Sequence, residues 1–164
     1  MIVTVFTPTY NRKEKLKRLY ANLLEQTCFK FEWLIVDDGS TDETEVVIKQ
    51  LIESENNFSI RYLKKNNGGK HTAYNIGVRE ARGDLFICVD SDDFLEKNAI
   101  KMLLDLKKDI QDSKINGIVA LKKDSNGNVL SDELPQEIKK CRMIDLERQY
   151  NCRGEFTFVF KTDI

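Results

Sequence analysis

Three aspartates follow a short apolar run within four positions of one another. The run, Leu85 to Val89, contains β-branched and aromatic residues and follows Gly83, which predicts a strand buried on both faces. Asp90, Asp92 and Asp93 come directly after it. Carboxylates this close repel one another unless a cation or a basic group lies among them. The spacing therefore predicts a site for Mg²⁺ or Mn²⁺, completed by phosphate oxygens and water.

Helix capping is the alternative explanation for these aspartates. Asp and Ser also form strand-to-helix caps, and Asp93 could cap a helix that begins near Leu95. One carboxylate is enough for a cap, so three after a buried strand favour the metal site.

The segments before the aspartates alternate between strand and helix patterns. After each apolar run, apolar residues at helical spacing predict a helix packed on the sheet. Gly77 inside the third such helix costs about 1 kcal/mol relative to Ala, which predicts close packing on a strand. The pattern indicates an α/β fold, with a central, mainly parallel sheet flanked by helices. The predicted strands before the aspartates are Ile2–Phe6, Phe31–Val36 and Ser59–Leu63.

Two strand ends carry residues that match capping boxes. Asn11 with Glu14, and Ser40 with Glu43, have the spacing in which a side chain caps the helix that follows. Both helices are therefore expected to begin at these residues.

Other polar residues at strand ends are candidates for ligand contacts. Asp37 and Asp38 are adjacent carboxylates, which is more than a turn requires. Tyr10 could pack on the first helix or contact a ligand at the strand's carboxyl edge. Lys70 begins a helix after two glycines, an arrangement that suits a phosphate. The full Walker spacing is absent, so a P-loop is excluded.

Patterns after the aspartates predict further elements. Apolar residues between positions 99 and 106 have helical spacing, and Ile115–Leu121 has a strand pattern. Asn126 with Gly127 indicates a hairpin, and Leu130–Lys140 is expected to be irregular. From position 156 to 161 aromatic residues alternate with others, which predicts a strand with one aromatic face.

Composition limits the class of protein. A chain of 164 residues with 41% hydrophobic content is long enough for one domain with a substantial core. The net charge of -1 gives no support for nucleic-acid binding. The four scattered cysteines indicate neither a zinc site nor a disulfide framework. No signal peptide precedes Val3 and no apolar run approaches the ~20 residues that span a bilayer, so we expect a cytoplasmic protein.

Four blocks of the sequence, in order, resemble family 2 glycosyltransferases with the GT-A fold, a Rossmann-like sandwich. Any one block would be weak evidence, but four in the family's order are specific. The blocks are Val5–Arg12, Leu34–Thr41, Asn66–Gly77 and Asp90–Asp93.

The resemblance, which is good over residues 2–98, implies a domain organisation. Residues 1–164 are expected to form a single GT-A domain. Residues 1–98 would be its nucleotide-sugar-binding half, and residues 99–164 would begin an incomplete acceptor half.

The resemblance also implies roles for the residues of the nucleotide site. The loop from Thr7 through Pro8 to Tyr10 would line the nucleoside pocket. Asp38 would accept a hydrogen bond from the base, which in this family is commonly uracil. Lys70 would lie near the base or the diphosphate.

For the metal, the resemblance implies a DxD element. Asp92 would be the main ligand of Mg²⁺ or Mn²⁺. Asp90 would contact the metal or the ribose, and Asp93 would support them. A bound cation would neutralise charge that grows on the leaving nucleotide.

The activity implied is transfer of a hexose, with inversion, from a nucleotide-sugar donor to an acceptor hydroxyl. The donor is expected to be UDP-linked, and the acceptor a saccharide or a lipid-linked molecule. Such enzymes build surface polysaccharides or glycoconjugates, so peripheral association with the inner face of the cell membrane is a family-level expectation. No amphipathic anchor is visible in the sequence.

The catalytic base is not identified. Inverting members place it, usually an Asp, in the acceptor-binding half, and neither Asp145 nor Asp163 has suitable spacing. We therefore expect the chain to be C-terminally truncated, with the base beyond Ile164, and to bind donor without completing transfer.

Other classes of protein fit the sequence less well. A response-regulator receiver needs an acidic pair after the first strand, where Thr7 and Pro8 stand. A nucleotidyltransferase needs a Gly-rich basic loop at the same position. Dinucleotide binding needs a G-x-G-x-x-G after a strand, and no predicted strand of this sequence is followed by one. A non-catalytic nucleotide-sugar-binding module of the same fold remains open.

Overall fold

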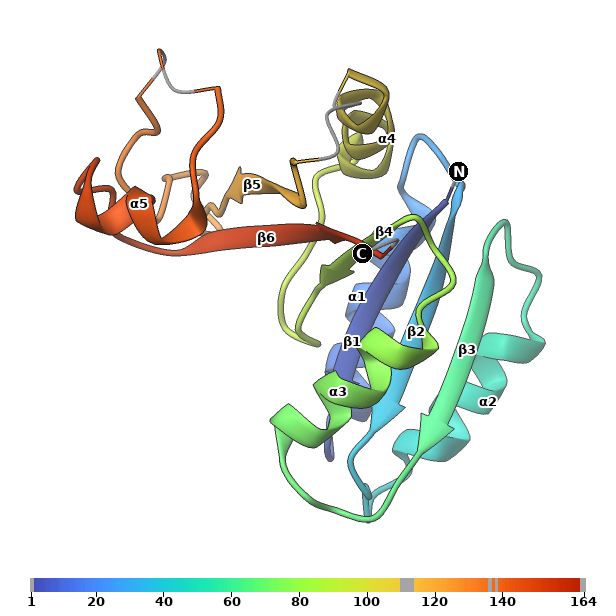
Figure 1. Ribbon diagram of the computed structural model, residues 1–164. Coiled ribbons are helices and arrows are strands. Elements are labelled where there is room, and N and C mark those ends of the chain that lie inside the picture. Colours follow the sequence, from blue (N-terminus) through green and yellow to red (C-terminus); the bar gives the residue numbers. More distant parts are fainter. Residues whose placement is uncertain (1, 110–113, 136, 138, 163–164) are drawn as a thin grey trace.

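The computed structural model describes residues 2–109, 114–135, 137 and 139–162. Its strands form one sheet in the order β3-β2-β1-β4-β6-β5 (Figure 1). The first four run parallel, and β6 runs antiparallel to both β4 and β5. This confirms the predicted α/β fold with a mainly parallel sheet. The strands are β1 (Val3–Thr9), β2 (Phe31–Asp37), β3 (Ser59–Lys64), β4 (Leu85–Cys88), β5 (Gly117–Leu121) and β6 (Phe156–Lys161).

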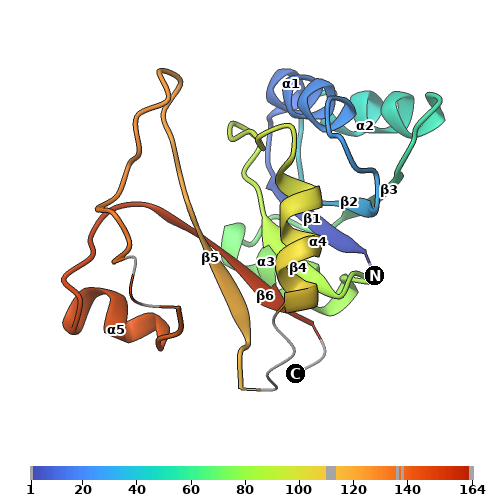
Figure 2. The same cartoon turned by 90° about the horizontal axis from the view of Figure 1, so that it is seen from above.

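Helices cover both faces of the sheet. Buried side chains of α1, α2 and α4 share one core cluster, and α3 contributes to a second cluster on the opposite face. Figure 2 shows α1 and α2 on one side of the strands and α3 on the other. Within the described ranges, every helix is too short or too polar to cross a membrane. The helices are α1 (Lys13–Leu24), α2 (Thr44–Glu53), α3 (Lys70–Glu80), α4 (Ala99–Asp109) and α5 (Met143–Arg148).

The central strands are buried on both faces, as their apolar runs predict. In β1, Val3 and Val5 point into the cluster under α1, and Phe6 points into the cluster under α3. The Phe6 ring stacks on Phe86 at a centroid distance of 5.3 Å. A Cβ at Gly77 would lie 2.4 Å from the Phe6 ring. The predicted close contact at this glycine is confirmed.

Both predicted capping boxes are wrong. The helices begin at Lys13 and Thr44, and the residue before each one makes no capping hydrogen bond with its side chain. Asn11 has a φ of 51°, and its Oδ1 accepts a hydrogen bond from the Thr41 backbone N–H at 2.8 Å. Ser40 Oγ accepts one from the Asn11 N–H at 2.9 Å. These side chains join two loops that are distant in sequence, and so they are unavailable to the helices.

Strand β1 continues beyond the predicted end at Phe6. It pairs with β2 as far as Thr9, but with β4 only as far as Phe6. Pro8 therefore lies where one side of β1 has no paired strand, a position that tolerates a missing N–H.

The later elements match the predictions in part. The predicted strand at Ile115–Leu121 begins at Gly117, and the predicted 156–161 strand is β6. The turn at Gly127 is confirmed, with its N–H bonded to the Asp124 carbonyl at 3.0 Å. Helix α5 was not predicted. Asp163 and Ile164 lie outside the described residues.

Candidate functional site

A pocket of about 270 Å³ opens where β1, β2 and β4 end. The carboxyl ends of parallel strands meet at one edge of a sheet, which is where ligands of open α/β folds bind. The order β2-β1-β4 makes these three strand ends neighbours. The pocket is lined by Pro8, Thr9, Tyr10, Arg12, Asp38, Lys70, Asp90, Ser91 and Asp92.

Asp38 forms a buried wall of this pocket and is 4% exposed. Its carboxylate accepts hydrogen bonds from the N–H groups of Gly68 at 3.0 Å and Gly69 at 2.7 Å, and it ion-pairs with Lys65. Burial raises the pKa of Asp38, but the bonds from Lys65 and the two glycines outweigh burial and hold the pKa below its ordinary value. The ionised carboxylate thus holds the loop that contains Gly68 and Gly69, here called the glycine loop, beside the pocket.

Its neighbour Asp37 has a different environment. Asp37 is fully buried and accepts hydrogen bonds from the Ser40 N–H at 2.8 Å and the Tyr62 hydroxyl at 2.7 Å. Burial and the bond to this carboxylate raise the pKa of Tyr62. Of the two adjacent carboxylates, Asp37 therefore braces the end of β2 and Asp38 faces the pocket.

Lys70, the first residue of α3, reaches across the pocket to Asp90. Its Nζ lies 2.7 Å from Asp90 Oδ2. Partial burial lowers the pKa of Lys70, but the hydrogen bond and the charge of Asp90 outweigh it, so the pKa is raised. The lysine remains charged at neutral pH and partly neutralises the acidic segment, residues Asp90–Asp93.

Asp92 contacts the first turn of α1. Its Oδ2 lies 2.6 Å from Lys15 Nζ and 4.0 Å from the Arg12 guanidinium. The hydrogen bond from Lys15 lowers the pKa of Asp92. The carboxylate is therefore ionised and about half exposed, at 54%.

Asp93 turns away from this pocket. Its carboxylate ion-pairs with Lys122 at 3.0 Å, and it is not among the lining residues. The helix that it could have capped begins at Ala99 and not near Leu95. Its expected support of the metal remains a prediction.

The two threonines of the first loop have different positions. Thr7 is fully buried, and its hydroxyl accepts a hydrogen bond from Trp33 Nε1 at 3.0 Å. It lies outside the pocket lining, whereas Pro8 and Tyr10 belong to it. Thr9 also lines the pocket, and its buried Oγ1 has no hydrogen-bond partner in the structure. An ordered water or a ligand is one way in which such a buried hydroxyl is satisfied.

Residues of the α1 start were missed by the sequence reasoning. Arg12 lines the pocket and Lys15 pairs with Asp92. Ser91 lines the pocket as well, and was noted only as part of the acidic segment. The signal for the basic pair was their position at a helix start beside a strand end. That signal is weak, because basic residues are common on exposed helix turns.

Two of the carboxylates that line the pocket are candidate ligands for a divalent cation. Asp90 and Asp92 bring two partly exposed carboxylates to the pocket. No group of three His, Cys, Asp or Glu side chains suited to a metal occurs in the described ranges. Mg²⁺-like ions use one or two carboxylates and complete their shell with phosphate oxygens and water. Two carboxylates therefore fit such a cation when a phosphate ligand is present.

Comparison with known sequences identifies relatives of known type. Chondroitin synthase from Escherichia coli is 36% identical over 110 residues, which cover 66% of this chain and 16% of that protein. Poly(ribitol-phosphate) beta-N-acetylglucosaminyltransferase TarS from Staphylococcus aureus is 33% identical over 103 residues, covering 62% and 18%. The chain thus spans less than a fifth of the length of either relative.

Solved structures and family models point to the same kind of protein as these relatives. TarS from Staphylococcus aureus in complex with UDP-GlcNAc superposes with a TM-score of 0.65 and 25% identity, over 99% of this chain and 46% of that one. The likeness confirms the predicted GT-A fold. The model of Glycosyl transferase family 2 matches residues 4–160. The chain therefore belongs to glycosyl transferase family 2.

Proposed function

We propose that the chain carries the donor site of a metal-dependent glycosyltransferase that moves a hexose from a UDP-linked donor to an acceptor hydroxyl during polysaccharide or glycoconjugate synthesis. The observation that carries this proposal is the pocket at the β1, β2 and β4 ends, where Asp38, Lys70, Asp90 and Asp92 converge. The UDP donor is supported by the resemblance to TarS, which was solved with UDP-GlcNAc.

The nucleoside would occupy the side of the pocket formed by Asp38 and the first loop. Asp38 Oδ2 accepts one hydrogen bond, from Gly69, and a carboxylate oxygen can accept two. It therefore keeps a lone pair for an N–H of the base. Thr9 Oγ1 supplies a second unpaired polar atom, and Tyr10, 45% exposed, presents its ring at the rim.

The diphosphate would lie between Lys70 and the acidic segment. Lys70 would donate to phosphate oxygens from the start of α3, where backbone N–H groups also favour an anion. Asp90 and Asp92 would hold the cation, which supplies a Lewis acid that neutralises the leaving diphosphate. The acceptor oxygen would form a bond to the anomeric carbon of the sugar while the bond from that carbon to the diphosphate oxygen breaks and UDP leaves. The proton of the acceptor hydroxyl would pass to a base.

The non-catalytic alternative keeps one observation in its favour. Each carboxylate that lines the pocket is ion-paired: Asp38 with Lys65, and Asp90 and Asp92 with lysines from two helices. Asp145, on α5, pairs with Arg142, the residue before that helix, at 2.8 Å. Among the described residues, a free carboxylate that could act as base is therefore not found at this pocket.

Calorimetric titration of UDP tests the donor site. With Mn²⁺ present we expect binding that disappears on adding EDTA and falls at least about ten-fold in Asp92→Asn, since a charged ligand is lost. Asp105→Asn, on the exposed side of α4, is the matched control and should bind as wild type. Wild-type chain that binds no UDP with Mn²⁺ would refute the proposal.

Transfer is measured separately from binding. The full-length protein is incubated with UDP-GlcNAc, Mn²⁺ and oligosaccharide acceptors, and UDP release is followed. Release that depends on acceptor supports the transferase. UDP binding without release under these conditions favours the non-catalytic module.

A further inference from the structure

The lysine at the start of α1 occupies a carboxylate that the proposed cation needs. Lys15 Nζ lies 2.6 Å from Asp92 Oδ2, and Arg12 lies 4.0 Å from the same oxygen. Both basic side chains are partly exposed, at 37% for Lys15 and 47% for Arg12. They can therefore move away without unpacking the core.

The second pocket carboxylate is occupied in the same way. Lys70 Nζ lies 2.7 Å from Asp90 Oδ2, and this lysine comes from α3, on the opposite face of the sheet from α1. Two of the three carboxylates that line the pocket, Asp90 and Asp92, are thus paired with lysines from two helices. In this arrangement the acidic segment is neutralised by the protein itself.

Lys15 and a divalent cation would compete for Asp92 Oδ2, the oxygen that Lys15 contacts. Positive charges a few ångströms apart repel one another, and the repulsion is strong where the protein partly excludes water. A cation that binds Asp92 Oδ2 must therefore displace Lys15. A lysine is suited to this exchange, because its charge sits at the end of a flexible four-carbon stem.

We propose that Lys15 is an exchangeable counter-ion: it holds Asp92 while the pocket is empty and turns to the donor diphosphate when the cation takes its place. This rests on the proposed function, because it needs a diphosphate and a cation in this pocket. Arg12, which lines the pocket beside Lys15, would move to the same phosphate oxygens.

Cooperative binding follows from the exchange. A cation alone must displace Lys15 into water, whereas a cation arriving with a diphosphate leaves Lys15 an anion to bind. Each ligand therefore raises the affinity for the other by the same factor, as linkage requires. In the absence of nucleotide, Lys15 weakens the binding of a cation to Asp92.

The test measures Mn²⁺ binding by electron paramagnetic resonance of the free ion, without UDP and with UDP, correcting for the Mn²⁺–UDP complex in solution. The variants are Lys15→Gln and the matched control Lys17→Gln. Lys17 lies on the same helix and pairs with Glu14 at 2.9 Å. Circular dichroism melts check that both variants fold.

We expect Lys15→Gln to bind Mn²⁺ alone two- to five-fold more tightly than wild type, the scale of one exposed ion pair. With Mn²⁺ present, its affinity for UDP should fall about ten-fold, because a charged hydrogen-bond donor is lost. Lys17→Gln should match wild type in both titrations. Lys15→Arg should restore most of the UDP affinity.

A double-mutant comparison isolates the pair. In an Asp92→Asn background, Lys15→Gln should no longer tighten Mn²⁺ binding, since its partner is gone. If Lys15→Gln behaves as Lys17→Gln while Asp92→Asn still weakens metal-dependent UDP binding, the counter-ion inference is wrong and the donor site stands. If the wild-type chain binds no UDP with Mn²⁺, both are wrong.

Discussion

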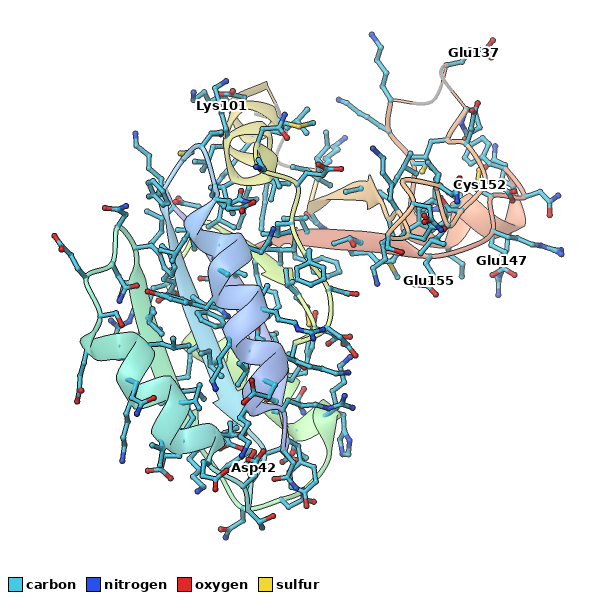
Figure 3. The ribbon with its side chains drawn as sticks, turned by 180° about the vertical axis from the view of Figure 1, so that it is seen from behind. Asp42, Lys101, Glu137, Glu147, Cys152 and Glu155 are labelled. Atoms are coloured by element: carbon cyan, nitrogen blue, oxygen red, sulfur yellow. The ribbon has the colours of Figure 1, made fainter. Side chains whose placement is uncertain are left out.

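The parallel half of the molecule and its C-terminal arm are built differently. The parallel half comprises β1 to β4 with α1 to α3, and the arm comprises β5, α5, β6 and their connections, residues 117–162. Every residue of β1 and β2 is buried, whereas Val159 is the one buried residue of β5 and β6. Figure 1 shows β6 extending away from the parallel strands toward α5. Glu147, Cys152 and Glu155 lie together on this arm, apart from Asp42 in the loop after β2 (Figure 3).

The pocket is formed by the parallel half and the acidic segment, and not by the arm. All residues that line the pocket belong to positions 8–92, in the parallel half and the acidic segment. The arm reaches the acidic segment through Lys122, which pairs with Asp93 at 3.0 Å and with Glu155 at 3.5 Å. Donor binding is therefore expected to depend on the tightly packed half, and the arm to contribute to other steps.

The largest loss in the free energy of unfolding is expected from a substitution that creates a cavity in the parallel half. Trp33 is fully buried, stacks on Tyr20 at 6.3 Å and donates to Thr7 Oγ1. Trp33→Ala should lower the free energy of unfolding by about 3–5 kcal/mol, through the lost contacts and the cavity. Urea denaturation followed by circular dichroism measures it, because Trp33 is the one tryptophan and its fluorescence is lost. A loss below about 1 kcal/mol would contradict the view that this half is the rigid core.

The parallel half was also the part whose fold the sequence predicted best. Its apolar runs and helical spacings are local signals, and they predicted the strands before Asp90 and the helices between them. Gly77 was predictable for the same reason, since a glycine inside a helix indicates a close neighbour. In the arm, α5 is only six residues long and mostly exposed, with Leu146 as its one buried residue, so its local pattern was too short to detect.

Side-chain roles were less predictable, because they depend on contacts distant in sequence. Asn11 and Ser40 match capping boxes but bond to each other's loops, 29 residues apart. Thr7 bonds Trp33, so Thr9 is the threonine that faces the pocket. Lys15 meets Asp92 across 77 positions. A local pattern carries no information about such partners.

A smaller effect, dependent on pH, is expected at Asp38. The charged hydrogen bonds from Lys65, Gly68 and Gly69 hold its pKa below the ordinary value. A lowered pKa means that the stabilisation is present above the unfolded-state pKa of about 4 and is lost as the pH falls through the folded-state pKa. Asp38→Asn should therefore lower the free energy of unfolding by about 1–3 kcal/mol at pH 7.

The difference between wild type and Asp38→Asn should shrink as the pH falls below about 4. Urea unfolding at several pH values between 3 and 7 would show this. Asp105→Asn is the control, because its carboxylate pairs with Lys101 and Lys108 on an exposed face, where ion pairs contribute little. A pH-independent difference for Asp38→Asn would mean that the charge of Asp38 is not what stabilises the glycine loop.

The smallest loss in the free energy of unfolding is expected in the arm, for a substitution at an aromatic residue of β6. Phe160 is 37% exposed and contacts Phe158 at a centroid distance of 6.4 Å. Because much of the ring already meets water, Phe160→Ala should cost about 1 kcal/mol, well below Trp33→Ala. The same urea titration measures it, with UDP and Mn²⁺ affinity as a second readout that should stay unchanged. A loss as large as that of Trp33→Ala would show that β6 belongs to the same cooperative core as β1, and a fall in UDP affinity would show that the arm shapes the donor pocket.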